Sequence, residues 1–202
     1  MSNPTSQPQF AIGAMLGQAW NMFTKNVGVL LGAYVLVAVI LVVGNLITFY
    51  LASIVLTGPF MLGLTSLGLK IVRGQPGDFN EVFSGFKRFL PAFMANLLIA
   101  IFSAIGGILC VIPGLFVVMV YTLTYYFMAD KNLDFWPAME ASRKVVMAAL
   151  GPWILLFLTL LGINFLGAIL CGLGTLVTVP LSILVLAQAY EQVKDSPAVT
   201  AS

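Results

Sequence analysis

Charged residues divide the chain into three long tracts that contain no Asp, Glu, Lys, Arg or His. The tracts cover 44 residues (26–69), 41 residues (89–129) and 46 residues (145–190). A helix that crosses a bilayer needs about 20 apolar residues, so each tract is long enough for two such helices and a tight turn. The pattern therefore predicts an all-α, polytopic membrane protein with six transmembrane helices arranged as three hairpins.

The same pattern predicts a simple domain organisation. We expect one six-span transmembrane domain at 10–195, a disordered polar tail at 1–9 and a flexible tail at 196–202. Within the domain, the hairpins are expected at about 27–73, 89–130 and 147–191.

The amino-acid composition is typical of a membrane protein, and the basic residues predict how the protein is oriented in the membrane. Hydrophobic residues make up 60% of the chain and charged residues 8%, against about 25% charged residues in soluble domains. All 16 ionisable side chains lie outside the apolar hairpins, so they end on one side of the membrane. The nine Lys and Arg residues among them predict that this side, with both termini, is cytoplasmic.

A short amphipathic segment precedes each hairpin. The first runs from about Phe10 to Asn26, the second begins at Asp78 with Glu81 placed as in a capping box, and the third begins near Asp134. An apolar face beside basic residues suits a helix that lies in the lipid headgroup layer. The alternative is that these faces pack on the transmembrane bundle, and both arrangements are compatible with the sequence.

The order of amphipathic helix, span, turn and span occurs three times, which is a weak internal repeat. In the two most similar copies, residues 19–23 align with residues 141–145, and Pro59 aligns with Pro180. Pro113 takes the same place in the middle copy, where a proline either starts the second helix or kinks it.

Small residues within the spans allow helices to approach closely. Candidate positions are the pairs Gly28 and Gly32, Ser103 and Gly107, and Gly162 and Gly167.

Candidate catalytic chemistry is sparse. The chain has no histidine, which excludes Ser-His-Asp and Cys-His catalytic arrangements, and two cysteines alone cannot build a structural zinc site. No ionisable residue lies within a span, although proton- and ion-coupled transporters usually keep one there. The sequence therefore predicts no catalytic, cofactor or metal site. The polar residues of the spans are expected to hydrogen-bond neighbouring helices; they include Asn45, Asn96, Asn164, Thr122, Thr124, Tyr125, Tyr126 and Gln188.

Two further features leave alternatives open. Cys110 and Cys171 each lie toward a non-cytoplasmic turn, where they form a disulfide or act as free apolar filler. Five basic residues beside aromatic or apolar faces are candidate contacts for anionic lipid, or else only fix orientation in the membrane. These candidates are Arg73, Lys87, Arg88, Arg143 and Lys144.

Several short motifs resemble a family of bacterial multi-pass proteins. The segments are Ile112-Pro113-Gly114-Leu115 followed by 121–130, the run 136–143, the ending 174–191 and the opening 19–26. They are similar to YciC-type inner-membrane proteins and to the membrane domain fused to some glycerophosphodiester phosphodiesterases. The resemblance implies six spans in a bacterial cytoplasmic (inner) membrane, and it implies no reaction.

Together these observations predict a non-enzymatic integral membrane protein. The leading interpretation is a scaffold or accessory subunit that contacts membrane lipids and another membrane protein, with no nucleic-acid partner. The alternative is a channel or uncoupled transporter for a small neutral or amphipathic solute.

Overall fold

The computed structural model describes residues 8, 10–48, 51–109, 111–169 and 174–196, and all regular structure in this part of the chain is helical. Six of its helical segments are long and apolar enough to cross a membrane, so the predicted all-α polytopic architecture is confirmed. The elements are α1 (Ile12–Lys25), α2 (Val27–Thr48), α3 (Leu51–Val72), η1 (Phe79–Arg88), α4 (Phe89–Leu109), α5 (Val111–Val120), α6 (Thr124–Asp130), α7 (Phe135–Ala148), α8 (Leu150–Ile169) and α9 (Thr175–Val193). The predicted tails at 1–9 and 196–202 lie almost wholly outside the described residues, as do Cys110 and Cys171.

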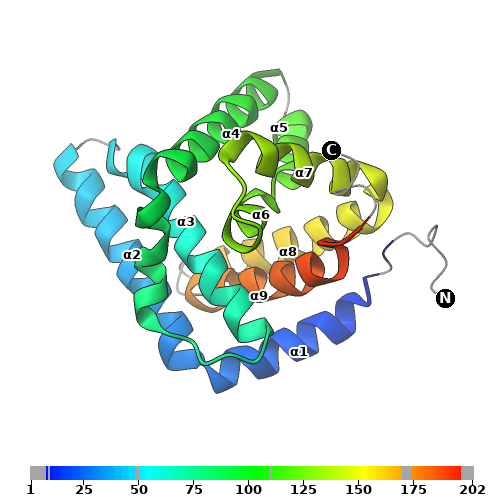
Figure 1. The fold of residues 1–202 in the computed structure, drawn as a ribbon, viewed down its shortest axis with the longest axis horizontal. Helices are drawn as coiled ribbons and strands as arrows, with labels where there is room; N and C mark the ends of the chain where they lie inside the picture. Colours follow the sequence, from blue (N-terminus) through cyan, green and yellow to red (C-terminus); the bar gives the residue numbers. More distant parts are fainter. Residues whose placement is uncertain (1–7, 9, 49–50, 110, 170–173, 197–202) are drawn as a thin grey trace.

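The first and second spans of each hairpin differ in how deeply they are buried in the bundle. The second spans, formed by α3, by α5 with α6, and by α9, are about half buried, whereas α2, α4 and α8 have only about a fifth of their residues buried. In Figure 1 the helices α3, α6 and α9 lie toward the middle of the view, and α1, α2 and α4 run along its edge. We call α3, α6 and α9 the inner helices, and α2, α4 and α8 the outer helices.

The amphipathic elements connect the hairpins in a closed ring. Each packs on the inner helix of a neighbouring hairpin: η1 packs on α3, α7 packs on α6, and α1 packs on α9. Their apolar faces are buried in these contacts, for example at Ala19 of α1, Val82 of η1 and Val146 of α7. Packing on the bundle, one of the two alternatives left open by the sequence, is therefore present in all three copies.

The outward faces of the same elements carry aromatic side chains that stay exposed. Trp20 is 52% exposed, Phe83 43% and Trp136 58%. Aromatic side chains of this kind are enriched where a bilayer meets water. Each amphipathic element thus packs against an inner helix on one side and leaves aromatic surface on the other, so it also retains the character of an interfacial helix.

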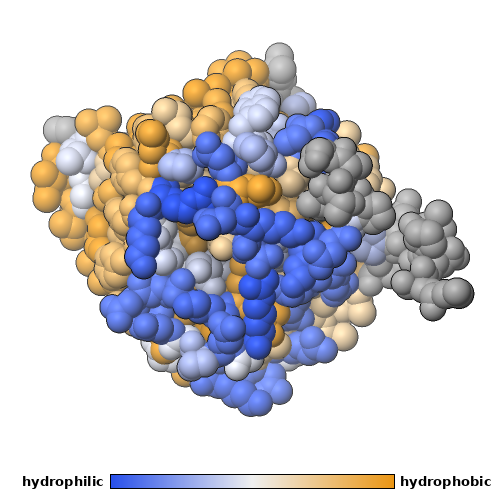
Figure 2. Space-filling model, viewed as in Figure 1, coloured by the Kyte–Doolittle hydropathy of each residue, from blue (hydrophilic) through white to orange (hydrophobic). Residues whose placement is uncertain are grey.

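The polar and apolar surfaces of the molecule are separated. Figure 2 shows hydrophilic residues over the centre and lower part of the viewed face, with hydrophobic residues along its left and upper rim. Large apolar side chains on the outer helices are strongly exposed, including Leu46 (78%) and Ile108 (86%). An apolar exposed rim beside a polar face is what a bilayer requires of a spanning bundle.

Four local features differ from what the sequence suggests. The second amphipathic segment is a 3-10 helix and not an α-helix, and Glu81 does not complete a capping box, because its carboxylate accepts hydrogen bonds from Ser66 and Lys70. The first span of the third hairpin, expected from about 147, begins at Leu150, because α7 continues to Ala148. The second span of the middle hairpin is interrupted between α5 and α6.

The prolines also differ in their positions. Pro113 lies in the first turn of α5, whereas Pro59 and Pro180 lie inside α3 and α9. Thus both alternatives for the repeated proline occur, each in a different copy.

Two glycines that the sequence pattern did not single out bring α3 and η1 into close contact. A Cβ atom on Gly63 would lie 2.0 Å from the backbone oxygen of Val82, and one on Gly85 would lie 2.0 Å from that of Pro59. Of the predicted positions, Gly167 contacts α9 near Thr178, while Gly28 and Gly162 have no atom within 4 Å of a built Cβ. The joint between α3 and η1 therefore depends on Gly63 and Gly85.

We predict that Gly63→Ala and Gly85→Ala each lower the free energy of unfolding by about 2 kcal/mol, because the added methyl group overlaps backbone atoms. Thermal unfolding in detergent micelles measures the loss. Gly162→Ala is the matched control: it also adds one methyl group inside a helix, where alanine is favoured over glycine. Equal melting of the Gly63→Ala and Gly162→Ala proteins would contradict the proposed contact.

Candidate functional site: an ion-pair network at the ends of the inner helices

Charged residues meet where the three inner helices end. Arg73 directly follows α3, Asp130 is the last residue of α6, and Glu191 lies in the last turn of α9. Arg73 Nη2 lies 2.5 Å from Asp130 Oδ1 and 2.7 Å from Glu191 Oε1, and Arg73 Nε donates to the same Glu191 oxygen at 2.8 Å. One guanidinium group therefore ties three helices from three different hairpins.

The network lies at the edge of the bundle, where water reaches it only in part. The Arg73 side chain is 32% exposed and that of Asp130 16%, so the ion pairs lie at the edge of the bundle and are partly shielded from water. Burial alone would lower the pKa of Arg73, but its hydrogen bonds to Asp130 and Glu191 outweigh that effect and raise the pKa. The guanidinium is a permanent cation, with the planar geometry that favours binding two carboxylates at once.

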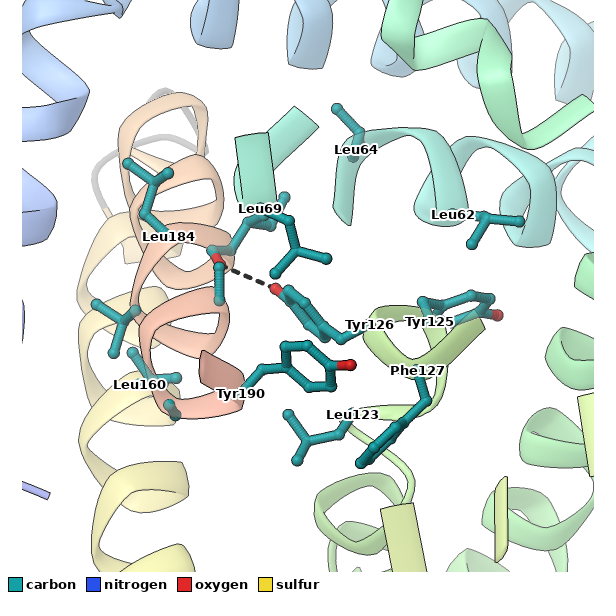
Figure 3. Packing of buried hydrophobic residues seen from close by; sticks show 14 of the residues in the cluster. Leu62, Leu64, Leu69, Leu123, Tyr125, Tyr126, Phe127, Leu160, Leu184 and Tyr190 are labelled. Atoms are coloured by element: carbon teal, nitrogen blue, oxygen red, sulfur yellow. Dashed lines mark hydrogen bonds between the residues drawn. The ribbon is translucent and has the colours of Figure 1, made fainter. Parts of the chain in front are cut away.

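Aromatic side chains continue the network into the apolar core. The Tyr190 hydroxyl donates to Asp130 Oδ2 at 2.7 Å, and the Tyr126 hydroxyl donates to the backbone oxygen of Ile183 at 2.8 Å. The Tyr190 ring stacks on Tyr126 with centroids 5.8 Å apart and meets Phe127 edge-on at 5.0 Å. Figure 3 shows these three rings side by side between α6 and α9, with the Tyr126 bond drawn as a dashed line.

Each amphipathic element is also joined to its inner helix by a polar bond. In η1, Glu81 accepts from Ser66 Oγ at 2.7 Å and pairs with Lys70, both on α3. In α1, the backbone oxygen of Met15 accepts from Gln188 Nε2 of α9 at 3.3 Å. In the low dielectric of a membrane protein such bonds supply the directional attraction that apolar contacts lack.

The third joint lies at the interruption between α5 and α6. The Ser142 hydroxyl of α7 donates to the backbone oxygen of Val120 at 2.7 Å and accepts from the backbone N–H of Leu123 at 3.2 Å. Ser142 is fully buried. Its side chain thus satisfies backbone groups that the break would otherwise leave without partners in an apolar environment.

Several polar side chains in the spans bond neighbouring helices, as the sequence predicted, whereas the buried Thr124 hydroxyl has no hydrogen-bond partner among the described residues. Asn45 Nδ2 of α2 donates to Ser53 Oγ of α3 at 2.6 Å, and Asn164 Nδ2 of α8 donates to Ser182 Oγ of α9 at 2.7 Å. Asn96 of α4 donates to the backbone oxygen of α3 at Ile54 and accepts from Tyr125 of α6.

The structure places the five candidate lipid contacts in different environments. Arg73 belongs to the ion-pair network, and Arg88 donates to the backbone oxygens of Met128 and Leu133. Arg143 and Lys144 both lie near Glu140, at 2.7 Å and 3.9 Å, and the bonds from Arg143 lower the pKa of the Glu140 carboxyl. Lys87 is exposed. Lipid binding at these five residues stays a prediction.

Sequence reasoning found Arg73 but missed its two carboxylate partners. The sequence did contain a signal for them, because the second span of each hairpin ends at a charged residue, and the three charges are of opposite sign: Arg73, Asp130 and Glu191.

Among the described residues no group of His, Cys, Asp or Glu is arranged to hold a metal ion. A pocket of about 20 Å³ beside Tyr121 and Glu140 has room for about one water molecule. The site is therefore suited to holding helices together.

Comparison with known proteins gives distant relatives. The chain is 28% identical over 152 residues to uncharacterised proteins of Mycobacterium bovis and Mycobacterium tuberculosis. The aligned part covers 75% of this chain and 46% of those proteins, so the match spans about half the length of these relatives. No family model matches the chain, and no solved structure matches it. The resemblance to YciC-type proteins stays a prediction.

We predict that Arg73→Met lowers the free energy of unfolding by about 2 kcal/mol, because it leaves Asp130 without its ion-pair partner and Glu191 paired with Lys194 alone. Denaturation in mixed micelles measures the loss, and adding Asp130→Asn should recover part of it. Arg143→Met is the control, since Arg143 pairs with Glu140 on its own exposed helix face, where water screens the pair and its loss should change stability little. Equal stability of the Arg73→Met and wild-type proteins would refute a structural role for the network.

Proposed function

We propose that this chain is a non-enzymatic integral membrane protein that works as a scaffold or accessory subunit. It would act through contacts with membrane lipids and with another membrane protein, in a bacterial inner membrane. The observation that carries this proposal is the use of its polar groups: Arg73, Asp130 and Glu191 bind one another, and Asn45, Asn96 and Asn164 bind neighbouring helices.

This use of polar groups argues against coupled transport and catalysis. A polar solute pays several kcal/mol when it is unpaired in hydrocarbon, so a conduit needs free polar groups along a continuous route. The inner helices instead close on each other at the charged face, where Tyr126, Tyr190 and Phe127 pack directly behind the ion pairs. What stays available for partners is the apolar outer surface of α2, α4 and α8.

The proposed orientation places the charged face and both termini in the cytoplasm. Nine Lys and Arg residues lie in the sequence segments on that face, which matches the bias of cytoplasmic loops.

We predict that single cysteines replacing Gln75 and Asp195, which are exposed on the charged face, resist membrane-impermeant maleimide in intact cells and react after lysis. Cysteines at positions 50 and 172, between the two helices of a hairpin, should react in intact cells. The background protein carries Ala at Cys110 and Cys171. Labelling of the Gln75→Cys protein from outside would reverse the proposed orientation.

One observation favours the alternative of a channel or uncoupled transporter. The interruption between α5 and α6 resembles the discontinuous helices that form binding sites in transporters. Next to it, the buried hydroxyl of Thr124 has no hydrogen-bond partner among the described residues. A small neutral or amphipathic solute would be the cargo.

Reconstitution separates the two functions. We predict that proteoliposomes show no proton- or sodium-driven accumulation of glycerol or alanine above protein-free liposomes, because none of the described residues deep in the bundle is an Asp, Glu, Lys, Arg or His that could couple transport. In cells, deletion should instead change the amount or assembly of a membrane partner, measured by quantitative proteomics of native complexes. Saturable flux that is lost in a stably folded Thr124→Val or Asn96→Ala protein would favour the transporter.

A further inference from the structure

The nine Lys and Arg residues are unequally engaged, and all of them lie in the described part of the chain. Seven have an acidic partner or a backbone oxygen within reach: Lys70, Arg73, Arg88, Lys131, Arg143, Lys144 and Lys194. Lys25 and Lys87 have neither an ion pair nor a hydrogen bond among the described residues, and both are exposed. Among the described residues, the side chains of these two lysines are thus the cations without any bonding partner.

These two lysines occupy equivalent places in the repeat. Lys25 is the last residue of α1 and Lys87 the last but one of η1, so each stands directly before an outer helix, α2 or α4. Exposed aromatic side chains lie nearby on the same elements: Trp20 is 52% exposed, and Phe83 43%. Lysine beside aromatic surface at the end of a spanning helix is a typical arrangement at headgroup level.

Below each lysine the outer helix exposes apolar surface along its length. On α2, Val39 is 53% exposed and Leu46 78%; on α4, Leu90 is 61% exposed and Ile101 43%. A ligand that fits both the lysine and the apolar face of the helix has an anionic head and apolar tails. A lipid phosphate is such a head, and lysine binds it as a point charge.

The third copy of the repeat lacks this cation. The alignment of residues 19–23 with 141–145 places Met147 opposite Lys25, and Met147 is 46% exposed near the end of α7. The nearest cations, Arg143 and Lys144, share the carboxylate of Glu140. The outer helix α8 therefore begins without a free positive charge.

We infer that Lys25 and Lys87 form two binding sites for anionic phospholipid at the N-terminal ends of α2 and α4, and that the third repeat has no such site. This inference rests on the proposed lipid-contacting function and narrows it to two of the three repeats. It also moves the expected contacts away from Arg73, Arg88, Arg143 and Lys144, whose charges are already engaged within the protein.

Retention of phosphatidylglycerol by the purified full-length chain, measured by native mass spectrometry after exchange from nanodiscs, tests the sites. Each lysine near an anionic surface changes affinity by about fivefold. The Lys25→Gln/Lys87→Gln protein should therefore bind phosphatidylglycerol about fivefold more weakly at each of two sites. Binding of phosphatidylcholine should stay unchanged, and so should the melting temperature.

The control removes the same charge elsewhere. Arg143→Gln/Lys144→Gln lowers the net charge by the same two units, and it should leave phosphatidylglycerol retention near that of wild type. An equal loss in both double variants would show that net charge alone attracts lipid and would overturn the inference. Retention that is unchanged in Lys25→Gln/Lys87→Gln would do the same, and would indicate that these lysines face an acidic protein partner or water.

A gain of function provides a second, independent test. Met147→Lys places a cation at the equivalent position of the third repeat, above the exposed face of α8. The inference expects one additional retained phosphatidylglycerol. No gain in a protein with wild-type melting would contradict the equivalence of the three positions. Neither outcome depends on solute flux or on a protein partner, so failure here is distinguishable from failure of the scaffold function.

Discussion

Arg73 joins the ends of three helices that come from three different hairpins. In a bilayer, apolar side chains gain little by leaving lipid for a neighbouring helix, so hairpins need directional bonds or close backbone contact to stay associated. Arg73 follows α3 and binds carboxylates from α6 and α9, which ties the three hairpins at one end. Tyr190 and Tyr126 extend this junction into the core, where their rings stack.

Around that junction the amphipathic elements close a ring. Each joint combines buried apolar contact with polar bonds. Glu81 bonds Ser66 and Lys70, Ser142 bonds the backbone at the interruption between α5 and α6, and Gln188 bonds the backbone oxygen of Met15. The joint between α1 and α9 connects residues near the two ends of the described chain. The three repeats therefore support one another cyclically, and the outer helices are left free to face lipid or a partner.

Much of this architecture could be predicted from the sequence because the bilayer imposes simple rules. The length of the uncharged tracts determined the six spans, and Asp134 marked the start of α7. Contacts between distant segments were not predictable. Nothing in the local sequence of Gly85 shows that it meets Pro59, and nothing around Ser142 shows that it enters a break in another helix. The partners of Arg73 were missed for the same reason, since Asp130 and Glu191 are 57 and 118 residues away along the chain.

The closed ring is the central claim, and cross-linking across its seam tests it most directly. Gln192 Nε2 lies 3.7 Å from Met15 Sδ, although the two residues are 177 positions apart. In membranes, a Met15→Cys/Gln192→Cys protein with Ala at Cys110 and Cys171 should be cross-linked within one chain by a short thiol-reactive bifunctional reagent. The product would migrate as a compact monomer on a non-reducing gel. A failure to cross-link, or cross-linking only between two chains, would contradict the packing of α1 on α9.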